Sequence, residues 1–229
     1  LADPTVTELW IARGTYRPVA CNTCGESERQ VAFELRRNLA VYGGFAGNET
    51  QRSERNVLLN PTILSGDIGN PIDSTDNSFQ VVRATDVDET LILDGLIIQE
   101  GNSDGTFDNN GYGGGGILID AAFGGEGSLV MRRCTIRNNF AGGGGGLQIR
   151  ANGGSSIVEP LIEDCVFEGN TASLGNVSSS GGAVFIFGQV AAVNPVFIGC
   201  TFRNNRCGGN AGALAINNSN TLGTELIPM

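Results

Sequence analysis

Two loops rich in aspartate and asparagine carry the side chains best suited to hold a hard cation. They span residues 102–111 and 67–77. Ca²⁺ takes roughly six to eight oxygen ligands from carboxylates, amides and backbone carbonyls. If the chain binds this ion, we expect the first loop to hold it, through Asn102, Asp104, Asp108 and Asn110. Neither loop has the spacing of an EF-hand, and the same residue types favour tight turns without a metal, so turn chemistry stays open.

Cys21 and Cys24 form a C-x-x-C pair in a loop segment. A zinc site needs two further ligands, but there is no second such pair and no histidine. A redox role needs a thioredoxin-like βαβ setting, which the sequence lacks. In a secreted protein a local Cys21–Cys24 disulfide is the favoured interpretation, and pairing of either with another cysteine stays open.

The composition of the 229 residues excludes several classes of protein. There is no histidine, and all 14 basic residues are arginine. Catalysis by Ser-His-Asp or Cys-His, Schiff-base chemistry and a P-loop are therefore excluded. The formal net charge of −10 argues against nucleic acid and anionic membranes as partners. No apolar stretch approaches the ~20 residues of a membrane helix.

Two short blocks recur in the second half of the chain in a fixed order. One begins with a cysteine and ends with an asparagine five residues later, and its copies start at Cys134, Cys165 and Cys200. The other is led by glycine and begins at residues 115, 145 and 181, with a variant at 211. Successive copies lie 30 to 36 residues apart, so the two blocks share one period.

Each repeat contains short runs of β-branched and aromatic residues between clusters of Gly, Asn and Ser, and none shows helical periodicity. A period near 30 residues built only from short strands is typical of one turn of a parallel β-helix. We therefore predict an all-β fold, a single right-handed parallel β-helix of roughly seven coils. Residues 1–112 would form less regular coils with loop insertions, and residues 113–229 the regular coils of the same β-helix.

Alignment of the repeats predicts columns of stacked side chains. Inward columns, which lie on alternate positions of a strand, would hold Cys134, Cys165 and Cys200, and also Ile136, Phe167 and Phe202. An asparagine ladder at a turn would hold Asn139, Asn170 and Asn205. Outward charges alternate in sign along Arg137, Glu168 and Arg203, which supports the same register because stacked like charges are destabilising.

The blocks resemble the repeats of the polymorphic outer-membrane proteins, in which GGA[ILV] alternates with FxxN. Residues 181–184 match the first motif, and residues 167–170 and 202–205 match the second. Residues 39–50 and 60–69 look like the opening block of large secreted bacterial β-helix proteins. The resemblance implies a secreted or surface-displayed bacterial protein, and it implies location and fold more than chemistry. The first residues show no signal peptide, and we interpret the chain as a processed or trimmed piece of a longer one.

Polysaccharide lyases and hydrolases also use the β-helix fold. A lyase without lysine would need an arginine, for which the candidates are Arg132, Arg133, Arg150, Arg203 and Arg206. A hydrolase would need two carboxylates at a defined separation, from among Asp86, Asp88, Asp94, Glu163 and Asp164. No motif fixes their geometry, and several arginines alternate with acids in the predicted columns. We therefore predict no catalytic residue and no required cofactor, with Ca²⁺ as an option.

The favoured function is an extracellular structural or adhesion module that stacks head-to-tail into a filament, because a β-helix has open strand edges at its ends. Its partners would be further copies of itself, or a glycan or protein at a cell surface. A polysaccharide-binding module is the alternative, although Trp10, Tyr16, Tyr42 and Tyr112 form no obvious ladder for sugar stacking. A Ca²⁺-dependent lyase or hydrolase is the less favoured third hypothesis.

Overall fold

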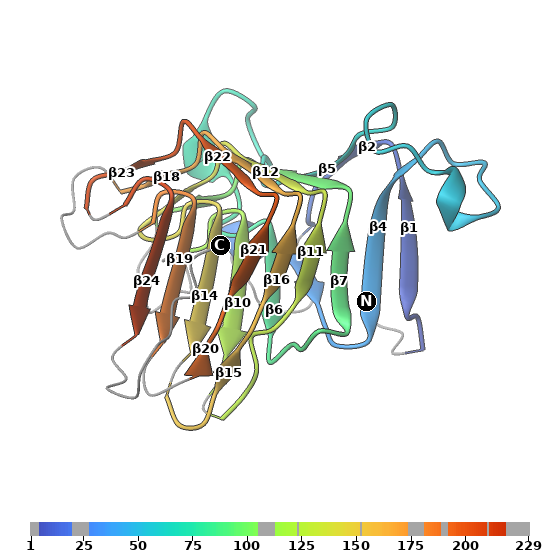
Figure 1. Ribbon diagram of the computed structural model, residues 1–229. Helices are drawn as coiled ribbons and strands as arrows, with labels where there is room; N and C mark the ends of the chain where they lie inside the picture. Colours follow the sequence, from blue (N-terminus) through green and yellow to red (C-terminus); the bar gives the residue numbers. More distant parts are fainter. Residues whose placement is uncertain are drawn as a thin grey trace.

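The computed structural model describes residues 5–19, 28–104, 113–122, 124–151, 153–173, 181–188, 192–209 and 211–218. In these segments the chain winds into stacked coils whose strands all pair in parallel, which is the predicted parallel β-helix (Figure 1). Three sheets run the length of the rod, and each has six strands. The described part therefore makes six coils, where the sequence predicted roughly seven. None of the helices described there is long and apolar enough to cross a membrane.

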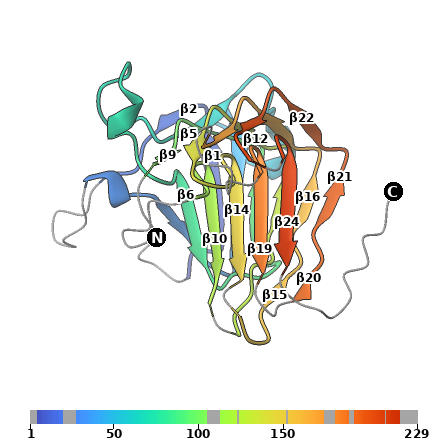
Figure 2. The same ribbon diagram turned by 90° about the vertical axis from the view of Figure 1, so that its left-hand side faces the viewer.

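The first sheet contains β1 (Glu8–Ala12), β4 (Leu39–Phe45), β7 (Leu91–Asp94), β11 (Val130–Arg132), β16 (Leu161–Glu163) and β21 (Val196–Ile198). The second contains β2 (Gly14–Tyr16), β5 (Thr62–Ser65), β8 (Leu96–Gln99), β12 (Thr135–Arg137), β17 (Val166–Glu168) and β22 (Thr201–Arg203). The third contains β3 (Phe33–Leu35), β6 (Val82–Thr85), β10 (Ile117–Ala121), β14 (Leu147–Ala151), β19 (Val184–Gly188) and β24 (Leu214–Asn218), and it faces the viewer in Figure 2.

Shorter elements complete the coils. A four-stranded sheet contains β9 (Asn102–Ser103), β13 (Phe140–Ala141), β18 (Thr171–Ala172) and β23 (Arg206–Cys207), and β15 (Ile157–Val158) pairs with β20 (Ala192–Val193). Three 3₁₀ turns, η1 (Glu28–Gln30), η2 (Arg52–Glu54) and η3 (Ser74–Asp76), lie in the N-terminal half.

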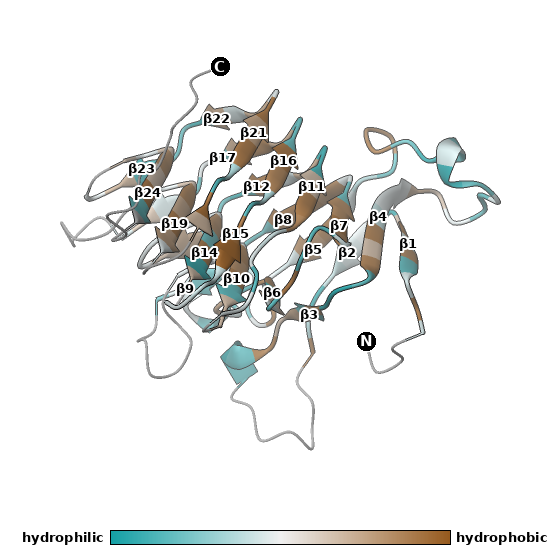
Figure 3. Cartoon of the chain, turned by 60° about the horizontal axis from the view of Figure 1, so that its bottom comes forward, coloured by the Kyte–Doolittle hydropathy of each residue, from teal (hydrophilic) through white to brown (hydrophobic). Residues whose placement is uncertain are grey.

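The core is built from columns of inward side chains, one from each coil. In the first sheet the column consists of Leu9, Val41, Leu93, Met131, Ile162 and Phe197. Its four middle members are buried, and the members on the first and last coils are only partly buried. Figure 3 shows the apolar residues repeating from strand to strand along the rod. Each coil thus buries its apolar face against its neighbours, as expected for a solenoid.

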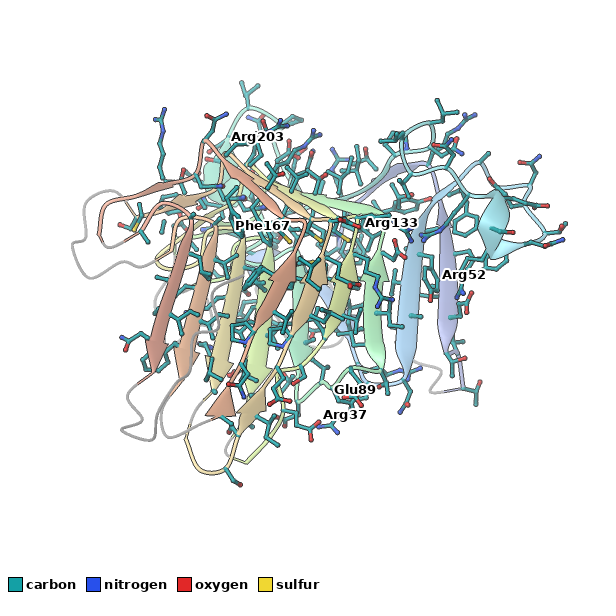
Figure 4. All side chains as sticks on the ribbon, in the orientation of Figure 1. Arg37, Arg52, Glu89, Arg133, Phe167 and Arg203 are labelled. Carbon is teal, nitrogen blue, oxygen red and sulfur yellow. The ribbon has the colours of Figure 1, made fainter. Side chains whose placement is uncertain are left out.

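The columns predicted from the repeats lie on the second sheet and its flanking corners. Phe167, labelled in Figure 4, pairs with Ile136 on one side and with Phe202 on the other. The Phe202 ring is stacked on that of Phe167 at 5.0 Å between centroids. Asn139, Asn170 and Asn205 bond from coil to coil: the Asn170 Oδ1 accepts from the Asn139 backbone N–H at 3.2 Å, and the Asn205 Oδ1 accepts from the Asn170 N–H at 3.0 Å. Stacked amides therefore satisfy the backbone at this corner.

Cys134, Cys165 and Cys200 form no disulfide. Each thiol donates a hydrogen bond to a backbone carbonyl, for example from the Cys200 Sγ to the Ile162 oxygen at 3.3 Å. Cys134 and Cys165 are buried, as small packing residues are. Hydrogen bonding with its cysteine neighbours Cys134 and Cys200, together with burial, raises the pKa of the Cys165 thiol, so it stays protonated.

A corner of one or two residues joins the first sheet to the second in four of the coils. It begins with a residue in the left-handed conformation, with φ between 49° and 74°: Gly95, Arg133, Asp164 or Gly199. In the second coil this corner is replaced by residues 46–61, a loop that leaves the rod beside β4 (Figure 1). Non-glycine residues adopt this left-handed conformation at a steric cost, and of the two that do so here Arg133 binds Asp94.

Candidate functional site

The expected calcium loop lies only partly inside the described residues. Asp108 and Asn110 lie outside them, as do Cys21 and Cys24. The Asn102 side chain is buried and donates to the Ser74 carbonyl at 2.7 Å, while Asp104 binds Arg29 at 2.7 Å. Both line a pocket of about 630 Å³. No group of three or more Asp, Glu or Cys side chains placed to hold a metal occurs among the described residues, and Ca²⁺ binding stays a prediction.

The second acidic loop shows the turn chemistry that its composition allowed. Asp73 caps η3 by accepting from the Thr75 backbone N–H at 2.9 Å, and hydrogen bonds from the Thr75 hydroxyl and N–H lower the pKa of its carboxyl group. Asp67 instead pairs with Arg17 at 2.9 Å.

The lyase and hydrolase candidates are spread along the rod as ion pairs. Arg150 binds Asp120 at 2.8 Å, Arg203 binds Glu168 at 2.9 Å, and Arg132 binds Glu163. Each of these pairs joins neighbouring strands of one sheet. These three pairs neutralise outward columns and do not converge on one cleft, whereas the candidates Arg133 and Asp94 meet at the corner between the first two sheets.

A second cavity, of about 540 Å³, lies at the corner between the first and second sheets. It is lined by Gln51, Arg52, Ser53, Arg55, Val57 and Arg133, and we call it the arginine pocket. Five of the lining residues come from the 46–61 loop, and Arg133 comes from the left-handed corner two coils further on. Figure 4 labels Arg52 and Arg133 on the same side of the molecule.

Two glutamates of the 46–61 loop accept hydrogen bonds from the loop's own backbone. The Glu49 carboxylate accepts from the backbone N–H groups of Ala46, Gly47 and Asn48 at 2.6, 2.9 and 3.1 Å. These bonds, led by that from Ala46, lower the pKa of Glu49. Glu54 accepts from the Thr50 N–H at 2.8 Å. The loop therefore presents Arg52 and Arg55 from a fixed backbone.

Asp94 holds two arginines of the pocket together. One carboxylate oxygen binds the Arg55 Nη2 at 2.7 Å and the Arg133 Nη2 at 2.5 Å, and the other accepts from the Arg133 Nε at 3.0 Å. The Asp94 side chain is only 6% exposed. Burial alone would raise its pKa, but the hydrogen bonds and charges of Arg133 and Arg55 outweigh burial, and the net pKa is lowered. The same contact raises the pKa of Arg133.

Aromatic side chains of β1 and β4 pack against or near the arginines of the pocket. The guanidinium groups of Arg52 and Arg55 lie over the ring of Tyr42 at 4.6 and 5.1 Å, and the Arg52 Nη1 donates to the Tyr42 hydroxyl at 2.9 Å. Trp10 is the register partner of Tyr42 on β1, and its ring stacks on Phe45 at 4.9 Å. Trp10 and Tyr42 are thus neighbours on adjacent strands, but Tyr42 is buried and the ring that Trp10 stacks on is that of Phe45.

The two ends of the rod are the other surface with an unusual composition. Inward residues of the first coil (Leu9, Ile11, Phe33 and Leu35) and of the last coil (Phe197, Phe202, Leu214 and Ile216) are only partly buried. Trp10, Val196 and Ile198 are outward apolar residues of the same two coils and are 41–43% exposed. Their equivalents in the middle coils are covered on both sides.

Comparison with known proteins connects one repeat to a family. Residues 164–186 match the Chlamydia polymorphic membrane protein repeat. The matched segment contains β17 and the start of β19, including Phe167, Asn170 and Gly181–Ala183, which carried the resemblance in the sequence. The predicted likeness to this repeat family is therefore confirmed for that segment. No curated protein and no solved structure matches the chain.

Sequence reasoning missed Arg52 and Arg55 altogether. Their signal was a pair of arginines three residues apart in an insertion that interrupts an otherwise short corner. The sequence offered Arg133 as a catalytic candidate and as a member of an outward column with Asp164, whereas the structure pairs it with Asp94.

Proposed function

We propose that this chain is a non-enzymatic structural and adhesion module of a bacterial cell surface, and that its rod extends by head-to-tail stacking on a second copy. The repeat of residues 164–186, which is similar to that of Chlamydia polymorphic membrane proteins, supports a surface location. The pairing of candidate catalytic residues into ion pairs along the rod supports a structural role.

The observation that carries the stacking is the state of the end coils. Within the described residues, β1, β2 and β3 at one end and β21, β22 and β24 at the other are edge strands of their sheets. Edge strands present unpaired N–H and C=O groups and recruit further strands. Together with the partly exposed inward residues, they make each end a surface that another coil would complete.

The two ends are complementary in composition. Extension of the columns would place Phe197 next to Leu9 of the next copy, Leu214 next to Phe33, and Ile216 next to Leu35. Outside the core, Ile198 would lie against Trp10, and Val196 against Glu8. A contact between two different faces does not close on itself, so it propagates into a filament.

The outward pair Val196 and Glu8 offers a test that leaves the core intact. Sedimentation velocity over a range of concentrations would compare the wild type with Val196→Glu and with the matched variant Val196→Arg. Like charges directly opposite on neighbouring strands are destabilising, so the first variant should weaken self-association and the second should strengthen it. A wild type that is monomeric at every concentration, or two variants that shift association equally, would contradict the proposal.

The same samples test the roles of calcium and of catalysis. We propose that Ca²⁺, if bound, is not required for stacking, so a chelator should leave the sedimentation profile unchanged. Incubation with acidic and neutral polysaccharides, with and without Ca²⁺, should produce no new reducing ends and no unsaturated products. Cleavage that depends on Arg133 would instead favour a lyase.

A further inference from the structure

Beyond its structural function, we propose that the arginine pocket binds an acidic sugar residue, whose carboxylate or sulfate group is held by Arg52 and Arg133. Both groups are oxyanions that match the planar fork of a guanidinium, and Arg binds them in bidentate fashion. The cavity, of about 540 Å³, falls within the usual size range of small-molecule sites.

Arg52 and Arg133 each have N–H donors that make no hydrogen bond within the described residues. Arg52 uses its Nη1 for the Tyr42 hydroxyl, and its Nε and Nη2 have no hydrogen-bond partner within the described residues. Arg133 uses its Nε and Nη2 for Asp94, which leaves its Nη1 without a bond there. Both side chains are about half exposed, at 50% and 51%, so a ligand in solution can reach them.

The charge of the pocket is unusual for this chain. Three arginines line it and no carboxylate does, in a protein whose formal net charge is −10. Asp94 is shared by Arg55 and Arg133, so it neutralises only one of their two charges. Glu8 forms an ion pair with Arg52 at 3.6 Å, so two carboxylates face three arginines and one positive charge is left over. Asp164 acts on Arg133 without forming an ion pair with it in the described chain. Elsewhere Arg150 and Arg203 each have a carboxylate of their own.

The loop that carries Arg52 is held on the rod by Arg55 and Val57. Arg55 is 10% exposed and bonds to the Gly43 and Asp94 carbonyls as well as to the Asp94 carboxylate. Val57 lies against Gly44 and Gly95, where a Cβ would collide with it, so the loop sits directly on the corner of the next coil. A site that is already rigid loses little entropy on binding.

A sugar is indicated by the aromatic surface beside the arginines. Trp10 is fixed by its stack on Phe45, yet 41% of it stays exposed. Its indole N–H donates to Glu8, whose other carboxylate oxygen faces Arg52. An exposed, rigid aromatic ring offers an apolar face with a polar edge. The apolar C–H face of a sugar ring can pack on Trp10 while its acidic group reaches the arginines, provided that Ile198 of a stacked copy does not cover the ring.

Isothermal titration calorimetry would test this with three probes: an oligogalacturonate for the carboxylate, a sulfated dextran oligosaccharide for the sulfate, and a neutral maltohexaose. We expect one or both acidic probes to bind and the neutral one not to. Arg52→Gln should weaken binding about tenfold or more, since hydrogen bonds to charged groups are the strong ones. Arg203→Gln removes an equally exposed arginine from another coil and should leave binding unchanged.

Binding of neither acidic probe, equal binding of the neutral probe, or equal losses in the two arginine variants would overturn the proposal. Arg52 is the better target because Arg133 also neutralises Asp94, and its loss would disturb folding. The titration is repeated with Val196→Glu, which alters only the end face. Because stacking would place Ile198 on Trp10, binding in this variant should be kept or strengthened, and failure of stacking leaves the pocket proposal testable.

Discussion

The N-terminal and C-terminal halves of the rod form similar coils but stabilise them with different side-chain interactions. In the C-terminal coils, β12, β17 and β22 and their corners repeat the same inward side chains, and identical groups stack: Phe on Phe and Asn on Asn. In the N-terminal coils the columns are mixed, and arginine–carboxylate pairs anchor the loops. These pairs are Arg17–Asp67, Arg29–Asp104, Arg37–Asp88 and Arg55–Asp94.

This difference shows how a repeat fold accommodates a site. A coil that repeats its neighbours is specified by stacking. A coil that departs from the repeat must fix its loop by other contacts, and those contacts create the arginine pocket. The most regular part of the chain is therefore the scaffold, and the least regular part carries the candidate binding chemistry.

The largest effect should come from the stacked core of the regular half. Phe167 is fully buried between Ile136 and Phe202. Phe167→Ala should lower the free energy of unfolding by about 4 kcal/mol, because it opens a cavity in a packed core. Phe202→Ala, in the last coil, should cost about half as much. Urea denaturation measures both, and equal losses would show that the last coil is packed as tightly as the middle ones.

The second largest effect should come from Asp94, which binds two arginines in the irregular half of the rod. Asp94→Asn leaves Arg55 and Arg133 without their shared carboxylate and should cost about 3 kcal/mol at neutral pH. Because the pKa of Asp94 is lowered on folding, its stabilising contribution is present above the usual aspartate value of 3.8 and is lost as the pH falls through the folded pKa.

Urea denaturation of the wild type and Asp94→Asn across pH 3 to 7 would check this sign. The stability difference between them should be constant near neutral pH and shrink in acid below about pH 4. A difference that does not depend on pH would mean that the charge of Asp94 is unimportant.

The asparagine ladder should contribute less to the free energy of unfolding than Phe167 or Asp94 does. Asn170→Ala removes the acceptor of the Asn139 backbone N–H and the donor to the Ile136 carbonyl, both buried. Leaving such groups unpaired should cost about 2 kcal/mol. Asn205→Ala, at the end of the same ladder, is the matched control and should cost about 1 kcal/mol by thermal or urea unfolding. A reversed order would argue against cooperation along the ladder.

The smallest effect should come from the outward charges of the regular half. Arg203 pairs with Glu168 on an exposed face, and exposed pairs contribute little. Arg203→Gln should therefore change the melting temperature hardly at all. A large loss would show that the outward column, and not the stacked core, specifies the register of these coils.

The sequence predicts the fold well where it repeats. The common period of the cysteine- and glycine-led blocks gives the β-helix, and aligned blocks give the opposed positions of Phe167 and Phe202. The pairing of Trp10 with Tyr42 does not follow from any repeat, because nothing in the first coils aligns with the later blocks. The pocket depends on where the 46–61 loop folds back, which is fixed by the tertiary contacts of Arg55 and Val57 rather than by local pattern.

Electron microscopy of the native protein, with Ca²⁺ and then with a chelator, tests the central claim of end-to-end stacking most directly. Six coils at about 4.8 Å each give a predicted subunit repeat of roughly 29 Å along a filament. Filaments with that repeat, lost in Val196→Glu and kept in Val196→Arg, are the expected result. Single short rods under every condition would contradict the account.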